Sequence, residues 1–442
     1  MRFLSLALGL LACLFAQEAL ALDGDADPVF GKNGQIALVR PQQTPGNAAQ
    51  PTGDLVVFAD GRLLWAAPLD DGSVWLGRAW RDGSADPMFG TDGTGRITLP
   101  GCGQKRNARL VADHAGGVYL WSSGCLRHVL DDGSLAPGFG MGAMPKDGFS
   151  AAELARDLSG RFVLAGREGQ QVKVYRFGPN GAADVGFGSD GSVEIDLPST
   201  NGARELNALA VRPDGRILVA GSRGNSSGPN LVVAQLLPSG LPDSAWGDNG
   251  LVDLAPPSGF NGLIANAMAL DIDGSLVVVG KASNGSNSCC VLVTRLDAGG
   301  QVVAETGLKF HQLSGQPSIY PFFEQRDSVV ILPNHRILIG SIAFPFSAPL
   351  THRTQYTLIR TFPNGDLDPR FGHDGWNSYT ISDPEGLGQL GDYNQMHAIG
   401  HDESDGSMVI LGRTFFEDNA TGNDYVSLVR ARFDLIFDGR FD

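Results

Sequence analysis

The stretch RTFPNGDLDPRFGHDG, from Arg360 to Gly375, decides the fold because its pattern returns along almost the whole chain. It reads as a strand end, a turn on Asn364-Gly365, a second turn on Asp368-Pro369, an aromatic at Phe371 and glycines that lead into another strand. Eight copies of this loop enclose seven units. Clear copies lie at 78–93, 176–191 and 235–250, and weaker ones at 23–34, 128–140, 295–307 and 430–442.

The aromatic position marks the period of the repeat. Its spacing of roughly 50 to 70 residues is typical of a propeller or a β-solenoid, because one unit of strands cannot bury its apolar faces alone. Stacked units form one cooperative body, so we expect a single domain rather than several ordinary ones. The eight marks are Phe30, Phe89, Phe139, Phe187, Trp246, Thr306, Phe371 and Phe441.

Each unit contains a hairpin and two further strands. In the best copy, apolar runs flank Asp214-Gly215, two residue types that accept the positive φ of a tight β-turn. A third run covers 231–237, and a fourth begins after each Phe-Gly, as in 95–99. We therefore predict an all-β fold, a seven-bladed β-propeller of four-stranded antiparallel blades. The other hairpin turns are expected at Asp60-Gly61, Ala115-Gly116, Ser159-Gly160, Asp273-Gly274, Asn334-His335 and Asp405-Gly406.

These motifs resemble the delta-60 repeat family, and the resemblance covers about residues 23–442. Units of that family are regarded as β-propeller blades in bacterial surface and secreted proteins of mostly undefined function. The resemblance implies the fold but indicates almost nothing about a ligand or a reaction. The unit also looks like that of NHL-type propellers, in which the strand after Phe-Gly would be the outermost of its blade.

Both ends of the repeat are partial copies of the same loop, so the ring is expected to close inside that loop. The N-terminal strand 35–39 should pair with the final strand 425–433. Such a clasp would tie the two ends together and remove an open sheet edge.

The first residues have the form of a secretory signal peptide. Met1-Arg2 is followed by the apolar run 3–16 and by Ala19-Leu20-Ala21, a small-x-small cleavage site. Residues 1–21 would be removed, and 22–442 would form one exported domain, periplasmic or secreted, or associated with the cell surface. A rival interpretation takes Leu10-Leu11-Ala12-Cys13 as a lipobox with a lipid anchor on Cys13.

Composition excludes several classes of partner. Hydrophobic residues make up 42% of the chain and charged residues 18%, so a large core is possible and disorder is not expected. The net charge of −15 argues against nucleic acid and against an anionic membrane, because either would require a basic face. No second apolar run follows the first, so we expect a protein that does not span the membrane. We also expect a monomer.

The short motifs that could indicate chemistry lack the structural context that they need. We therefore expect no cofactor, no metal and no catalytic residue. The glycine pattern at 186–191 is followed by a strand, whereas a dinucleotide site needs a helix there. Calcium at Asp23-Gly24-Asp25-Ala26-Asp27 and a metal pair at His397 and His401 remain alternatives to turn and surface roles. Arginines eight residues before an aspartate predict loop-spanning ion pairs, namely Arg78 with Asp86, Arg176 with Asp184, Arg360 with Asp368 and Arg430 with Asp438.

The cysteines fit an exported protein. Cys102 precedes and Cys125 follows the hairpin of the second unit, and both loops should leave the blade on the same face. A disulfide between them is therefore expected in an oxidising compartment. Cys289 and Cys290 could form a vicinal disulfide or remain thiols.

Two functions fit this sequence. The first is a binding scaffold for an envelope or extracellular protein or glycan; the alternative is a periplasmic enzyme with its site at the mouth of the central channel. Long loops grow toward the C-terminal units and are rich in large side chains, so we expect the binding face there. Its candidate residues are Tyr320, Phe322, Phe323, Phe344, Phe346, Tyr393, Phe415 and Phe416. The competing interpretation is that these aromatics pack the long loops onto the blades.

Overall fold

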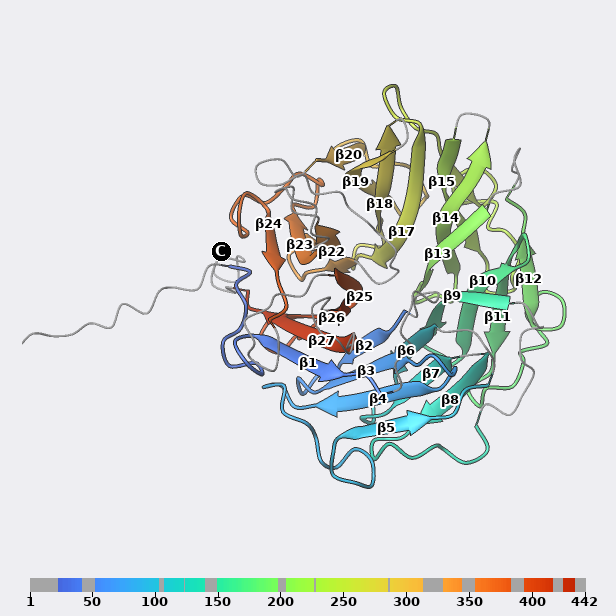
Figure 1. Ribbon diagram of the computed structural model, residues 1–442. Helices are drawn as coiled ribbons and strands as arrows, with labels where there is room; N and C mark the ends of the chain where they lie inside the picture. Colours follow the sequence, from blue (N-terminus) through green and yellow to red (C-terminus); the bar gives the residue numbers. More distant parts are fainter. Residues whose placement is uncertain are drawn as a thin grey trace, which may run out of the picture.

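The computed structural model is a seven-bladed β-propeller, with antiparallel sheets arranged around a central axis (Figure 1). The fold predicted from the repeat is therefore confirmed. Among the described residues there is no helix, and so none that could cross a lipid bilayer. The structure describes residues 23–41, 52–102, 107–122, 124–139, 149–197, 204–225, 228–284, 287–312, 329–343, 354–382, 393–415 and 424–433.

Each blade runs outward from the axis in chain order, so its first strand is innermost (Figure 1). The first strands are β2 (Asp54–Val57), β6 (Ala108–Ala112), β9 (Phe149–Arg156), β13 (Arg204–Val211), β17 (Gly262–Leu270), β21 (Val329–Ile331) and β25 (Tyr393–His401). The second strands are β3 (Leu63–Pro68), β7 (Val118–Ser122), β10 (Phe162–Glu168), β14 (Ile217–Asn225), β18 (Leu276–Asn284), β22 (Ile337–Ala343) and β26 (Met408–Phe415).

The outer half of each blade holds the third and fourth strands. The third strands are β4 (Val74–Ala79), β8 (Cys125–Val129), β11 (Gln171–Phe177), β15 (Gly228–Leu236), β19 (Asn287–Leu296), β23 (Gln355–Thr361) and β27 (Asp424–Ala431). The fourth strands are β5 (Arg96–Leu99), β12 (Ser192–Ile195), β16 (Leu251–Leu254), β20 (Leu308–His311), β24 (Trp376–Tyr379) and, in blade 7, β1 (Gln35–Val39). Blade 2 has three strands in the part of the chain that the structure describes.

The hairpin turns lie where the sequence predicts them. At the predicted turn positions φ is positive, for example 81° at Gly61 and 84° at Gly215. Glycine enters this region without the steric penalty that a Cβ imposes. Blade 6 departs from the rule, because His335 occupies the position with φ of 62°.

The core lies between neighbouring blades. In blades 1, 3 and 4 the aromatic of the repeated loop closes the gap to the next blade, as predicted. Phe89 and Phe187 are fully buried and Trp246 is 2% exposed, each within a cluster of aliphatic side chains from two blades. Burying a large ring in this way removes apolar surface from water and fixes the spacing of the blades.

The ring closes as predicted, by a clasp of the two chain ends. Strand β1 pairs with β27, from Gln35 opposite Val429 to Val39 opposite Tyr425. The Asp27 N–H donates to the Arg430 carbonyl at 2.8 Å, just as the Asp86 N–H donates to the Arg78 carbonyl at 3.0 Å in blade 1. The repeated loop of blade 7 is therefore assembled from both ends of the chain.

Three of the four predicted Arg–Asp ion pairs are confirmed. The N···O distances are 2.7 Å for Arg78–Asp86, 2.8 Å for Arg176–Asp184 and 2.9 Å for Arg360–Asp368. The fourth partner, Asp438, lies outside the described residues. Among the described residues, Arg430 contacts Asp402 at 2.8 Å and Asp405 at 2.7 Å.

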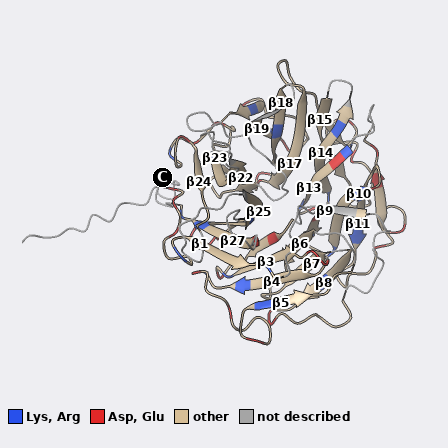
Figure 2. Cartoon of the chain, viewed as in Figure 1, with Lys and Arg blue, Asp and Glu red and all other residues tan. Residues whose placement is uncertain are grey.

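The two faces of the ring are built differently. The turn face carries the hairpins between first and second strands, such as 271–275, and the repeated loops between third and fourth strands, such as 80–95. The loop face carries the connections between second and third strands and from blade to blade, because successive strands are antiparallel. Figure 2 shows acidic and basic residues mainly on turns and loops, while the strands are mostly neutral.

Candidate functional site

A groove of about 570 Å³ lies on the rim between blade 7 and blade 1. It is lined by the end of β1, by β4 and by β5 with the loop that precedes it. The clasp creates this groove, because β1 is the outer strand of blade 7 and lies beside blade 1 (Figure 1). Its volume falls in the range of roughly 300 to 1,000 Å³ that is typical of small-ligand pockets.

The lining of this groove combines apolar and polar groups. Val39 is 50% exposed, and the Arg96 guanidinium carbon lies 5.8 Å from the centroid of the Trp75 ring, a cation–π contact. Asp92 accepts hydrogen bonds from the backbone N–H and the hydroxyl of Thr94, which lower the pKa of its carboxyl group. The groove therefore offers an aromatic edge, a cation, an anion and hydroxyl groups to one ligand.

A second polar group lies toward the loop face beside inner strand β25. The Nδ1 atom of His397 accepts the Gly53 N–H at 3.1 Å, which places the ring proton on Nε2. Burial, and then the positive charges of Arg413, Arg40 and Arg109, lower the pKa of His397 to about 3. The imidazole is therefore neutral at physiological pH.

The arginines around His397 are held by acids. Asp424 binds Arg40 through one carboxylate oxygen and Arg413 Nε through the other, the latter at 2.7 Å. The cavity lined by Arg40, His397 and Arg413 measures about 10 Å³. That volume corresponds to about one water molecule, so an organic substrate does not fit beside His397 in this conformation.

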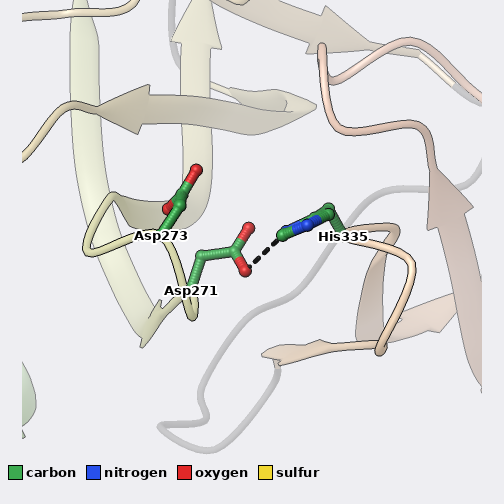
Figure 3. A group of neighbouring side chains, drawn as sticks. All are labelled: Asp271, Asp273 and His335. Carbon is green, nitrogen blue, oxygen red and sulfur yellow. Dashed lines mark hydrogen bonds and ion pairs between the residues drawn. The ribbon is translucent and has the colours of Figure 1, made fainter.

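Asp271, Asp273 and His335 form a third group, on the turn face between blades 5 and 6 (Figure 3). Their ligand atoms lie within 4.8 Å of one another, and His335 Nδ1 is 2.8 Å from an Asp271 oxygen. Arg295 Nη1 lies 2.7 Å from the other Asp271 oxygen and 3.7 Å from Asp273. Because a guanidinium already lies beside both carboxylates, the arrangement does not fit a metal cation.

The predicted aromatic binding residues fall mostly outside the described part of the chain. Tyr320, Phe322, Phe323, Phe344, Phe346 and Phe416 lie there. Tyr393 and Phe415 are opposite one another in the pairing of β25 with β26, at its loop-face end, and Phe415 is half-buried. The prediction of a binding surface at these eight residues remains a prediction.

The other predicted sites have mixed outcomes. The structure joins Cys102 and Cys125 by a disulfide, as predicted. Cys290 is buried, while the Cys289 side chain, Cys13 and the proposed signal peptide lie outside the description.

The residues of the two alternative metal sites, the calcium loop and the histidine pair, are arranged differently from what metal binding would require. In the possible calcium loop, Asp27 lies 2.7 Å from Arg432 and Asp23 lies 2.6 Å from Arg360, so arginines neutralise these acids. A β-bulge at His397 interrupts the strand alternation on which its pairing with His401 rested.

Sequence reasoning missed the rim groove. Trp75, Arg96 and Thr98 belong to blade 1, whereas Val39 belongs to the N-terminal strand. Their proximity follows from the clasp, which the sequence did predict, so a search along the β1–β5 boundary could have found the groove.

Comparison with known proteins supports the fold. A sequence profile described as "Domain of unknown function (DUF5122) beta-propeller" matches residues 212–245, within blade 4. No curated protein matches this chain.

Solved structures with a similar fold include polysaccharide lyase Uly1, at 13% identity and a TM-score of 0.48, covering 94% of this chain and 98% of that one. A catalytically inactive virginiamycin B lyase from Staphylococcus aureus with quinupristin aligns at 10% identity and a TM-score of 0.44, covering 89% and 98%. A protein of unknown function from Dyadobacter fermentans aligns at 11% identity and a TM-score of 0.41, covering 92% of this chain and 100% of that one. The profile match within blade 4 supports a β-propeller repeat at residues 212–245.

Proposed function

We propose that this chain is an exported β-propeller scaffold of the delta-60 repeat kind that binds an envelope or extracellular glycan or protein. Residues 1–21 would direct its export, and residues 22–442 would form the propeller. The observation that carries the binding role is the rim groove between blades 7 and 1, which has the volume of a small-ligand site.

The chemistry of the groove favours a glycan. A sugar presents an apolar ring face and many hydroxyl groups. The Trp75 edge and Val39 can contact the former, while Arg96, Asp92 and Thr98 can hydrogen-bond the latter. The disulfide between Cys102 and Cys125 suits a protein that works in an oxidising compartment.

The predicted aromatic residues supply a second place for a partner. The connections 312–328, 344–354, 380–392 and 416–423 join strand ends on the loop face of blades 5 to 7. Large side chains in such connections suit a protein partner. The alternative is a periplasmic enzyme with its site at the mouth of the central channel; the cavity of about 10 Å³ beside His397 would not hold its substrate.

Binding to arrayed bacterial surface glycans, with pull-down from the envelope fraction, tests both places. Arg96→Ala should abolish glycan binding, whereas Arg167→Ala, another half-buried arginine on blade 3, should leave it unchanged. If the long connections bind instead, the triple change Tyr320→Ala, Phe346→Ala and Phe416→Ala abolishes capture and Arg96→Ala does not. A wild-type protein that retains no glycan and no partner would refute the scaffold function.

A further inference from the structure

In blade 5 the arginine of the repeated loop lacks both of the partners that it has in blades 1, 3 and 6. In blades 1, 3 and 6 this arginine contacts the aspartate eight residues later and lies over the loop aromatic. The guanidinium carbon is 5.1 Å from the Phe89 ring centroid in blade 1 and 4.4 Å from that of Phe187 in blade 3. In blade 5 the arginine is Arg295, but Val303 replaces the aspartate and Thr306 replaces the aromatic.

The backbone of the blade 5 loop is nevertheless that of the other blades. The Val303 N–H donates to the Arg295 carbonyl at 2.9 Å, and the Thr306 N–H donates to the Val303 carbonyl at 3.1 Å. The corresponding bonds of Asp86 and Phe89 in blade 1 measure 3.0 and 3.1 Å. Val303 therefore stands where a carboxylate stands elsewhere, and the change is one of chemistry rather than of fold.

This change leaves polar atoms unpaired. Arg295 is 6% exposed, and its Nη1 binds Asp271 at 2.7 Å and Ser275 at 2.6 Å. Among the described residues, its buried Nε and Nη2 atoms have no hydrogen-bond partner, nor has Oγ1 of Thr306, a residue only 2% exposed. Buried donors of a charged group are costly to leave unsatisfied, so such atoms point to a missing partner.

The geometry of the free atoms indicates what that partner is. Nε–H and one Nη2–H lie parallel on the same edge of a guanidinium, and this edge binds both oxygens of a carboxylate at once. It is also the edge to which the aspartates of blades 1, 3 and 6 bind through Nε. Because the atoms are buried, we take the partner to be a small anion rather than a side chain of a partner protein.

Blade 7 brings three carboxylates to the equivalent arginine, with Arg81 3.2 Å from Asp402 and Arg432 2.7 Å from Asp27 as further cations. There Arg430 contacts Asp402 and Asp405 of the hairpin turn, the counterparts of Asp271 and Asp273, at 2.8 and 2.7 Å. A third carboxylate, that of Asp27, still lies 3.4 Å from Arg430 Nε. Blade 5 has the same arginine and the same two turn acids and lacks the third carboxylate.

His335 of the neighbouring blade 6 also lies at this site. It holds a φ of 62° where the equivalent turns have glycine, and its ring contacts Asp271 (Figure 3). A residue with a Cβ in this region is strained, and strain of this kind is often found at ligand sites. The three departures from the repeat, at Val303, Thr306 and His335, thus gather around one arginine.

We propose that blade 5 binds a small carboxylate anion on the Nε and Nη2 edge of Arg295, in place of the aspartate that the repeat lacks there. The Thr306 hydroxyl would donate a further hydrogen bond. The bound anion would complete the blade 5 loop in the way that a side chain completes it in blades 1, 3 and 6.

Thermal unfolding in sodium formate, compared with sodium chloride at equal ionic strength, tests this site. The melting temperature of the wild type should rise with formate and saturate, because the anion binds the folded state. Val303→Asp supplies the carboxylate within the chain, so it should melt higher in chloride and lose the response to formate. Asp184→Ala in blade 3 removes the carboxylate from Arg176 and should gain a response to formate.

A direct binding measurement keeps the test independent of stability. Saturation-transfer NMR should detect formate on the wild type and lose the signal with Val303→Asp. Equal melting in formate and chloride, with no transfer to formate, would overturn the site. A formate response that persists in Val303→Asp would show adventitious binding elsewhere and would overturn it as well.

Discussion

Phe30→Ala is the sharpest test of the clasp. Phe30 is fully buried in a cluster with Trp65 and Leu428, between blade 7 and blade 1. It belongs to the N-terminal copy of the loop, so its ring fixes the end of the chain to both blades. Truncating a buried phenylalanine costs about 3 to 5 kcal/mol. We expect the upper part of this range, because loss of the ring also loosens β1.

Val29→Ala provides the matched control, because Val29 is the preceding residue and is 64% exposed. Its free energy of unfolding should stay within about 0.5 kcal/mol of the wild type. Urea unfolding followed by tryptophan fluorescence measures both variants, since Trp65 lies in the same cluster as Phe30. If Phe30→Ala unfolds at the same urea concentration as Val29→Ala, the clasp does not hold the ring together and our reasoning fails.

Three further predictions concern the disulfide, the buried histidine and the repeated ion pair. Replacing Cys102 and Cys125 by serine should lower stability by about 3 kcal/mol in the chain-entropy estimate, measured by urea unfolding. Finding both thiols alkylatable in native wild-type protein would contradict the bridge. His397 has its pKa lowered to about 3 from 6.5, so the unfolded state takes up its proton first as pH falls. Stability should therefore drop by about 1.4 kcal/mol per pH unit between these two values, and His397→Asn should remove that slope; an unchanged slope would refute the assignment. Arg78→Met should cost about 3 to 5 kcal/mol because it removes the closest cation from the buried Asp86, and a cost near zero by the same assay would show that the pair is not structural.

Much of the fold could be predicted because the repeat carries local information. A turn such as Asp214-Gly215 requires a positive φ, and a ring such as Phe187 requires a gap to fill, so each is recognisable within its own unit. The clasp followed from one further observation, that both ends of the chain are fragments of one loop. These features depend on spacing within the sequence rather than on contacts across the ring.

The candidate sites were harder to predict because they depend on contacts between blades. The pKa of His397 is lowered by burial and then by three arginines from distant parts of the chain, whose meeting no local pattern indicates. The contacts of Arg430 with Asp402 and Asp405 were missed for the same reason, since these acids come from the hairpin rather than from the loop that follows. At Arg295 the signal was visible, as a valine and a threonine where the repeat has an acid and an aromatic.

The pairing of β1 with β27 also constrains the order in which the protein can fold. During synthesis β1 emerges early, yet its partner is completed only when almost all of the remaining chain has been made. Until then blade 7 has no outer strand, and β1 exposes unpaired backbone groups that can bind another chain. Contacts this distant in sequence form slowly, so the unfinished propeller has a long interval in which aggregation competes with folding. A chaperone that covers β1 during this interval should therefore raise the yield of folded protein more than one that acts on any other blade.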